Sequence, residues 1–251
     1  SNDEILKIIG GLDLGSVNIQ PSGERGAILR FKEIDEAIHQ KVVSTINEKW
    51  QMEEKRFESI GPTIGAELKR KAIFAIILAA ALIILYIAWA FRKVSWPVSS
   101  WKYGVCAILA LIHDVTIPTG VFSLLGHYRG VEVDGLFITA LLTILGFSVH
   151  DTIVVFDRVR ENLKNAPKER FEDTVSASVN QTIGRSINTS LTVLLVLSAI
   201  YFFGGETIKN FALALILGVS FGTYSSIFIA SPLLVSWHLL SQKRAVIQRK
   251  K

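Results

Sequence analysis

The sequence predicts an α-helical membrane protein with a small mixed α/β domain before its first membrane helix. Half of the 251 residues are apolar, and the mean hydropathy is +0.40. Beyond residue 71, apolar runs reach about 20 residues, the length that crosses the hydrocarbon core of a bilayer. Residues 1–71, by contrast, hold 23 of the 49 acidic and basic side chains. This composition excludes a single soluble globule, a disordered chain and a nucleic-acid-binding domain.

The charged N-terminal segment, residues 1–71, is predicted to form a compact α+β domain with the element order β-β-α-β. That order suggests half of a ferredoxin-like sandwich. The expected elements are strands at 16–20 and 27–31, a helix at 33–50 and a returning strand at 51–60. Because about 70 residues make only a marginal core, we expect this domain to contact a partner domain.

Residues 72–251 are predicted to form a transmembrane bundle of five helices followed by a C-terminal tail. The helices are expected at 72–91, 104–126, 135–156, 187–203 and 211–237. The chain also contains a single cysteine, Cys106, which lies in an apolar run and excludes an internal disulfide.

The distribution of basic residues predicts how the bundle is oriented. Two loops and the tail are rich in Lys and Arg, whereas the two opposite loops hold only Arg129 and Lys209. Lys69, Arg70 and Lys71 precede the first helix on the side opposite to the basic loops and the tail, but these three charges are fewer than those of the loops and the tail together. The C-terminus is therefore expected to be cytoplasmic and residues 1–71 extracytoplasmic. Because nothing in this sequence would export residues 1–71, we expect a further N-terminal membrane helix, six in the full-length protein.

Three ionisable residues in or beside the predicted membrane helices are candidates for function. Asp114 lies near the middle of the second helix, Asp151 near the cytoplasmic end of the third, and Arg185 just before the fourth. Asp151 and Arg185 are expected at similar depth, where they would form an ion pair. The pair would either bind and release a proton as the helices shift or simply fix the helix register. Asp114 would bind a proton or be held by neighbouring hydroxyl groups.

Small residues recur at four-residue spacing on the fifth predicted helix. This stripe consists of Gly218, Gly222, Ser226 and Ala230. Small side chains at this period let a second helix approach closely. The stripe predicts either static packing or a face along which helices slide during a transport cycle.

The sequence contains no motif for a metal, a nucleotide or another cofactor. The repeated His-Asp dipeptides lack an HExxH pattern or a cysteine cluster, so no metal site is predicted. An intramembrane aspartyl protease would need two carboxylates in contact, whereas Asp114 and Asp151 are expected at different depths. A proton is the expected coupling ion, and another ion is not excluded.

Several segments together resemble the SecF family of protein-export subunits. The motif GFSVHDTIVVFDRVREN at 146–162 is similar to the signature around the family's fourth membrane helix. The segment RSINTSL at 185–191 resembles the start of the next helix. Further similar segments lie at 57–68, 203–215 and 222–232. Residues 1–56 match only in general pattern.

The resemblance implies a six-helix, non-enzymatic subunit of the RND superfamily in the bacterial inner membrane. It would use the proton motive force to promote preprotein translocation. Implied partners are SecD, the SecYEG translocon, a YajC-like accessory protein, preproteins and membrane lipids, but no nucleic acid. The family's proton-path carboxylate and arginine correspond to Asp151 and Arg185. The family usually has Asn before that aspartate, so His150 would tune the site or accompany a different ion.

Three other functions remain open from the sequence. The first is an RND-type exporter of small molecules, for which an outer domain of about 70 residues is small. The second is a structural scaffold that stabilises a partner. The third is an intramembrane hydrolase that depends on both aspartates.

Overall fold

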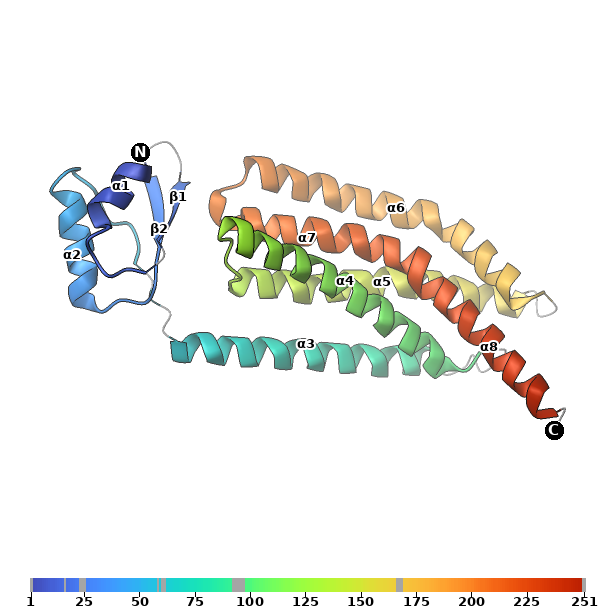
Figure 1. The fold of residues 1–251 in the computed structure, drawn as a ribbon. Helices are drawn as coiled ribbons and strands as arrows, with labels where there is room; N and C mark the ends of the chain where they lie inside the picture. Colours follow the sequence, from blue (N-terminus) through green and yellow to red (C-terminus); the bar gives the residue numbers. More distant parts are fainter. Residues whose placement is uncertain are drawn as a thin grey trace. The chain divides into compact units, whose positions relative to one another are not determined.

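The computed structural model describes residues 2–15, 17–22, 26–57, 59, 62–91, 98–165 and 169–249. The chain divides into two compact units, Ser1–Ala72 and Ile73–Lys251. Figure 1 shows a small α/β unit and a bundle of long helices.

The N-terminal unit contains a two-stranded antiparallel sheet and two helices in its described residues. In chain order the elements are α1 (Asn2–Ile9), β1 (Asn18–Ser22), β2 (Gly26–Arg30) and α2 (Glu36–Asn47). The strands pair from Asn18↔Arg30 to Ser22↔Gly26. The two predicted strands and the predicted helix are present with shifted ends, whereas α1 was not predicted.

The third predicted strand, at 51–60, is not formed in the described residues of that segment. The β-β-α-β order of half a ferredoxin-like sandwich is therefore not shown. Residues 51–57 and 59 adopt no regular structure, while residues 58 and 60 lie outside the described residues. The physical reason is the composition of this segment. Four consecutive charged residues, 53–56, interrupt the alternation of apolar and polar side chains on which a half-buried strand depends.

The core of this unit forms between α1, α2 and the intervening loop. Ile9, Leu14, Val42 and Ile46 are its buried apolar residues. Helix α2 begins after Asp35, whose side chain accepts a hydrogen bond from the backbone N–H of Ile38 at 2.8 Å. This cap satisfies a backbone donor that the helix itself leaves unpaired.

A buried histidine joins α2 to the irregular segment that follows it. His39 donates from Nε2 to Glu54 at 2.8 Å and from Nδ1 to Glu36 at 3.3 Å. Its ring stacks on Phe57 with 3.7 Å between the ring centroids. The bond to Glu54 is the main reason that the pKa of His39 lies above its ordinary value of 6.5. Carboxylates face both ring nitrogens, so the arrangement favours the imidazolium form.

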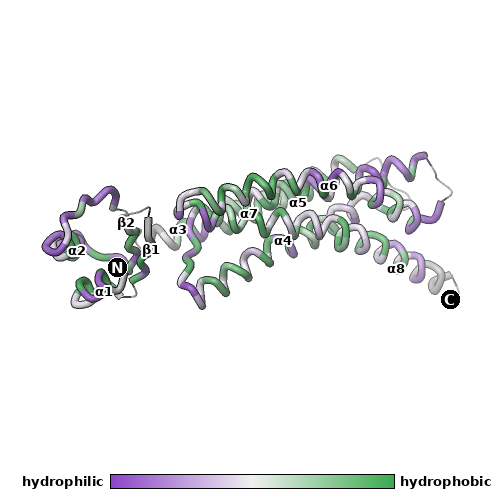
Figure 2. Tube along the Cα trace, turned by 90° about the horizontal axis from the view of Figure 1, so that it is seen from above, coloured by the Kyte–Doolittle hydropathy of each residue, from purple (hydrophilic) through white to green (hydrophobic). Residues whose placement is uncertain are grey.

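The described residues contain five helical segments long and apolar enough to cross a membrane, as predicted. Four are continuous helices: α3 (Pro62–Ala90), α4 (Ser100–Arg129), α5 (Gly135–Asn165) and α6 (Phe171–Phe203). The fifth is divided into α7 (Glu206–Ser225), a π-helical turn η1 (Ser226–Ala230) and α8 (Ser231–Arg249). Figure 2 shows green, apolar stretches along these helices and purple, polar residues toward their ends.

Helix α6 begins 16 residues before the predicted start at residue 187. The polar residues between 171 and 186 looked like a loop in the sequence. Several of them, including Thr174, Ser178 and Thr182, are buried, and their hydroxyl groups donate to backbone carbonyl oxygens of α6 or of the Arg170 cap that precedes it. Arg185 therefore lies inside α6 rather than before it.

Helix α7 packs against α4, α5 and α6 and is the centre of the bundle. Apolar side chains such as Phe122, Ile144 and Val219 fill the contacts around it. Ile87 of α3 and Phe91, which follows the end of this helix, belong to a second apolar cluster shared with α4 and α5. Most of the large apolar side chains of α3 are exposed, as expected for a helix that faces lipid or a partner.

Two glycines of α7 permit its close contact with α5. A Cβ atom built on Gly218 would collide with the side chain of Ile144. A Cβ atom on Gly222 would lie 3.2 Å from the Cβ of Ser148. Such contacts are typical of small residues that let two helix backbones approach.

Replacing Gly218 by alanine tests this close contact. Gly218→Ala should destabilise the bundle by about 1–3 kcal/mol, because the added methyl group must displace α5 or Ile144. Thermal unfolding of the purified chain in detergent measures the change. Gly120→Ala in α4 is the matched control, since nothing lies within 4 Å of a Cβ at that position. An equally small effect of both substitutions would contradict the close contact.

The raised pKa of His39 predicts a pH-dependent stability of the N-terminal unit. A group whose pKa is higher in the folded state stabilises the fold fully below its unfolded pKa. That contribution is lost as the pH rises through the folded pKa, which lies above 6.5. Hydrogen-exchange protection of α2 amides, corrected for intrinsic rates, should therefore decline across this range. His39→Gln should remove most of the decline, and an unchanged pH profile in this variant would refute the assignment.

Candidate functional site

Two aspartates inside the helix bundle form the centre of the candidate site. Asp114 on α4 is 0% exposed and Asp151 on α5 is 7% exposed. An ionisable side chain at membrane depth is costly to keep there and is a functional candidate for that reason. A carboxyl group removed from water needs hydrogen-bond partners in its place.

Side chains from three helices surround Asp114. Ser148 of α5 and Ser225 of α7 both donate to its Oδ2, with 2.6 Å between Ser225 Oγ and that oxygen. His113 donates from Nδ1 to Oδ1 at 2.9 Å, although consecutive helical residues generally point in different directions. The two serines are buried, whereas the side chain of His113 is 29% exposed.

Asp151 is held by two further serines. Ser186 of α6 donates to Oδ1 and Ser226 of η1 donates to Oδ2, each at 2.6 Å. Ser225 and Ser226, which bind different aspartates, are consecutive residues. Asp114 is bound by Ser148, which lies one helical turn before Asp151 on α5, so the expected difference in depth between the two aspartates is small. Consecutive serines on one helix bring the two carboxyl groups to neighbouring levels, although the structure places no hydrogen bond between them.

The predicted ion pair between Asp151 and Arg185 does not form in this structure. Arg185 is exposed and makes no ion pair with the described residues. The reason is helical geometry, because successive residues are rotated by about 100° around the axis. Since Ser186 faces Asp151, Arg185 points elsewhere. His150 is likewise exposed while Asp151 beside it is buried.

The four small residues of the predicted stripe occupy buried positions but act differently. Gly218 and Gly222 lie against α5, and Ala230 is 0% exposed. Ser226 has an additional polar role, since it donates to Asp151. A Cβ on Gly222 would also lie 3.8 Å from Oδ2 of Asp114. The same close approach that packs α5 and α7 therefore brings their serines to the carboxyl groups.

The helix that supplies two of the serines changes its geometry at the site. The π-helical turn η1 begins at Ser226, and the hydroxyl of Ser231 donates to the backbone oxygen of Ser226 at 2.9 Å. Pro232 follows and has no N–H to continue regular α-helical bonding. Short π-helical turns inside α-helices occur frequently at functional sites.

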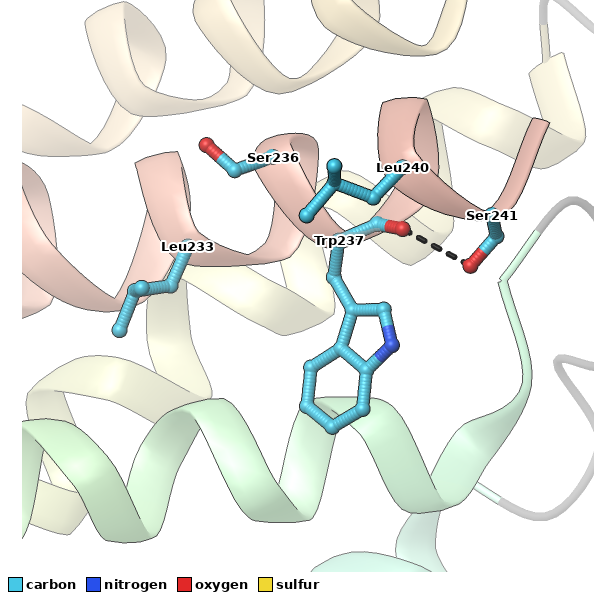
Figure 3. A pocket seen from close by; sticks show the side chains of 5 residues that line it. All are labelled: Leu233, Ser236, Trp237, Leu240 and Ser241. Atoms are coloured by element: carbon cyan, nitrogen blue, oxygen red, sulfur yellow. Dashed lines mark hydrogen bonds between the residues drawn. The ribbon is translucent and has the colours of Figure 1, made fainter. Parts of the chain in front are cut away.

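A hollow of about 230 Å³ on α8 is separate from the carboxyl groups. Its lining residues are Leu233, Ser236, Trp237, Leu240 and Ser241, shown in Figure 3. Trp237 packs edge-on against Trp101 of α4 with 5.0 Å between ring centroids, and Lys102 Nζ donates to Ser241 at 2.8 Å. The hollow shares no residue with the aspartate site, and the contacts of Trp237 and Ser241 beside it connect α8 to α4.

Sequence reasoning found both aspartates but missed three of the serines that hold them. Ser148, Ser186 and Ser225 are short polar residues in apolar helices, where they also occur as ordinary packing residues. A usable signal was available for Ser148, which lies one helical turn before Asp151 on the same face of α5. Ser186 and Ser225 could be assigned only after the helices were placed side by side.

Comparisons with known proteins place this arrangement in a family. The family model described as "Protein export membrane protein SecD/SecF, C-terminal" matches residues 38–240. Protein translocase subunit SecF of Thermobaculum terrenum is 53% identical over 216 residues, which are 85% of this chain and 67% of that protein. Protein translocase subunit SecDF of Thermus thermophilus is 45% identical over 180 residues, 72% of this chain and 23% of SecDF.

A solved structure agrees with these relatives. The crystal structure of SecDF in its super-membrane-facing form matches with a TM-score of 0.68 and 34% sequence identity. The match covers 90% of this chain and 29% of the SecDF chain, so this chain spans less than a third of that structure's length. With residues 38–240 matched by the family model, this chain belongs to the SecD/SecF C-terminal family of protein-export membrane proteins.

Proposed function

We propose that this chain acts as a SecF-type subunit of a bacterial protein translocase and couples proton movement to preprotein export. The observation that carries the proposal is the manner in which Asp151 is held. Its two oxygens accept hydrogen bonds from serine hydroxyls instead of pairing with a cation. A hydroxyl group can donate to a carboxylate or accept from a carboxylic acid, so this site accommodates both protonation states.

The coupling step we propose exchanges the partner of Asp151. Ser186, its present partner on α6, is adjacent to Arg185, and a partial rotation of α6 would bring the guanidinium group toward the carboxylate. A nearby positive charge favours the ionised carboxyl group, whereas the apolar, serine-lined environment tolerates the neutral form. Proton binding and release would therefore alternate with the position of α6.

The partner that we propose for the bundle is SecD, which would cover a polar outer face of α5 and α6. Exposed residues of α6 follow one stripe at helical spacing: Gly184, Arg185, Asn188, Thr189 and Thr192. On the neighbouring α5, Thr139, Thr143, Gly146 and His150 form a second exposed stripe. Polar groups at membrane depth, Arg185 above all, are costly against lipid and usually face protein or water. The SecDF relative supports a SecD partner, because its name combines both subunits.

The remaining features of the proposal concern orientation and assembly. The basic loops and tail support a cytoplasmic C-terminus in the inner membrane, with the N-terminal unit on the periplasmic side. In that position the N-terminal unit would meet preproteins that leave the SecYEG channel, and a YajC-like protein would complete the assembly. The proposed work is transport driven by protons, without covalent catalysis or a bound cofactor.

Replacing Asp151 by asparagine tests proton coupling directly. Asp151→Asn keeps the size of the side chain but removes its titration. Preprotein translocation into inverted membrane vesicles should fall to the level of vesicles that lack the subunit, because no proton can be bound and released at this position. The measurement is the fraction of preprotein that becomes protease-protected with and without an imposed proton gradient.

Asp157→Asn is the matched control for this substitution. Asp157 lies on the same helix, is exposed and pairs with Arg160 at 2.9 Å. The control should retain translocation at the level of the unmodified subunit. Gradient-dependent translocation by the Asp151→Asn subunit, at a normal protein level, would exclude Asp151 as the coupling group.

The proposed SecD interface predicts a specific crosslink. A cysteine at Asn188, introduced into a form in which Cys106 is replaced by alanine, should crosslink to cysteines scanned along the membrane helices of SecD. A cysteine at Phe74 of α3, which is 65% exposed, should remain mainly uncrosslinked. Efficient crosslinking at Phe74 and none at Asn188 would place SecD on a different face of the bundle.

A further inference from the structure

We propose that His113 exchanges protons between Asp114 and the outside of the bundle, so that the two residues form a second proton-binding site. This inference rests on the proposed proton coupling at Asp151. It concerns a different carboxyl group and a residue to which the coupling step above gives no role. The observations behind it are the burial of Asp114, the position of the histidine ring and the arrangement of the neighbouring side chains.

The first observation is that the carboxyl group of Asp114 is enclosed while its histidine partner is not. Asp114 and the two serines that donate to it are no more than 1% exposed. The side chain of His113 is 29% exposed, and its Nδ1 lies 2.9 Å from Oδ1 of Asp114. Among the described partners of this carboxyl group, His113 alone has a ring that can bind a proton on one nitrogen and release one from the other, and it alone reaches the surface of the bundle.

The second observation is that neighbouring groups orient the ring and do not compete for its proton. Phe221 and Tyr224 of α7 flank the ring, with centroid distances of 6.2 and 6.4 Å. The described titratable groups that face His113 are Asp114 on α4 and Tyr224 on α7. From α5 comes Ser148, which does not titrate in this range. Nδ1 is thus committed to Asp114, and Nε2 is the nitrogen left to exchange a proton outside.

The proton transfer balances with water at the outside of the bundle as the proton donor and acceptor. A hydronium ion transfers a proton to Nε2 of neutral His113, which gives an imidazolium group and a water molecule. The Nδ1–H bond then breaks as its proton bonds to Oδ1 of Asp114, which leaves a neutral imidazole and a neutral carboxylic acid. The reverse sequence releases the proton. Because Ser225 and Ser226 are consecutive, a change in the charge of Asp114 occurs beside the group that holds Asp151.

His113→Gln distinguishes a proton-transfer role from a structural one. Glutamine can still donate a hydrogen bond to Asp114, but it cannot carry a proton across the side chain. The full complex in lipid bilayers is studied by infrared difference spectroscopy, in which Asp114→Asn identifies the carboxyl band. Hydrogen–deuterium exchange of that band should slow by about a hundredfold in His113→Gln, the scale of a lost acid–base group. His127→Gln, on the same helix, should leave the exchange rate unchanged.

The outcomes separate this inference from the proposed function. An unchanged exchange rate in His113→Gln overturns the role of His113, whether or not Asp151→Asn abolishes translocation. Normal gradient-dependent translocation by the Asp151→Asn subunit overturns proton coupling at Asp151. It does not change what the infrared measurement says about Asp114. If His113→Gln fails to assemble with its partners, His113→Ala with and without added imidazole replaces it. If added imidazole speeds the exchange of the Asp114 carboxyl proton in His113→Ala, the role of His113 is supported. If His113→Ala without imidazole exchanges at the rate of the unsubstituted protein, that role is overturned.

Discussion

The bundle depends on keeping two carboxyl groups inside an apolar environment. Removing such a group from water costs several kcal/mol unless hydrogen bonds replace those of the solvent. Asp114 and Asp151 each receive hydroxyl donors from helices other than their own. Four helices are therefore held at one level by polar contacts. Apolar side chains alone would allow these helices to slide, because one apolar contact is readily exchanged for another, whereas a misplaced carboxyl group loses its partners.

This polar constraint explains why small residues are needed at the same level. A serine side chain is short, so it reaches a carboxyl group on another helix only when the two backbones are close. Gly222 provides that closeness between α7 and α5, and its missing Cβ leaves room beside both Ser148 and Asp114. Gly218 maintains the contact one turn away against Ile144. Packing and hydrogen bonding at the site are consequently a single requirement, since separating the helices would remove the donors from both aspartates.

The sequence predicted the five membrane segments and both buried aspartates because long apolar runs and charges within them are strong local signals. It failed where the signal depends on tertiary contacts. The first half of α6 looked like a loop because its buried threonines and serines are satisfied by their own helix. The expected Asp151–Arg185 pair is not formed in this structure because residues 185 and 186 face different directions, and Ser186 is the one that reaches Asp151. The strand predicted at 51–60 is likewise not formed in the described residues of that segment, which His39 contacts through the side chains of Glu54 and Phe57 instead of through a strand ladder.

The position of Arg185 beside Ser186 on α6 gives the proposed proton coupling at Asp151 a physical basis. A carboxyl group transports protons only if two states of the protein offer it environments with different electrostatics. Adjacent residues of α6 carry the two required chemistries, a neutral hydroxyl at Ser186 and a permanent cation at Arg185. The cation is costly on a membrane-facing surface, so its outward position is tolerable only where a partner or water receives it. A partner subunit that covers this face would thereby set how readily α6 turns, and the movement of the partner would control when Asp151 holds a proton.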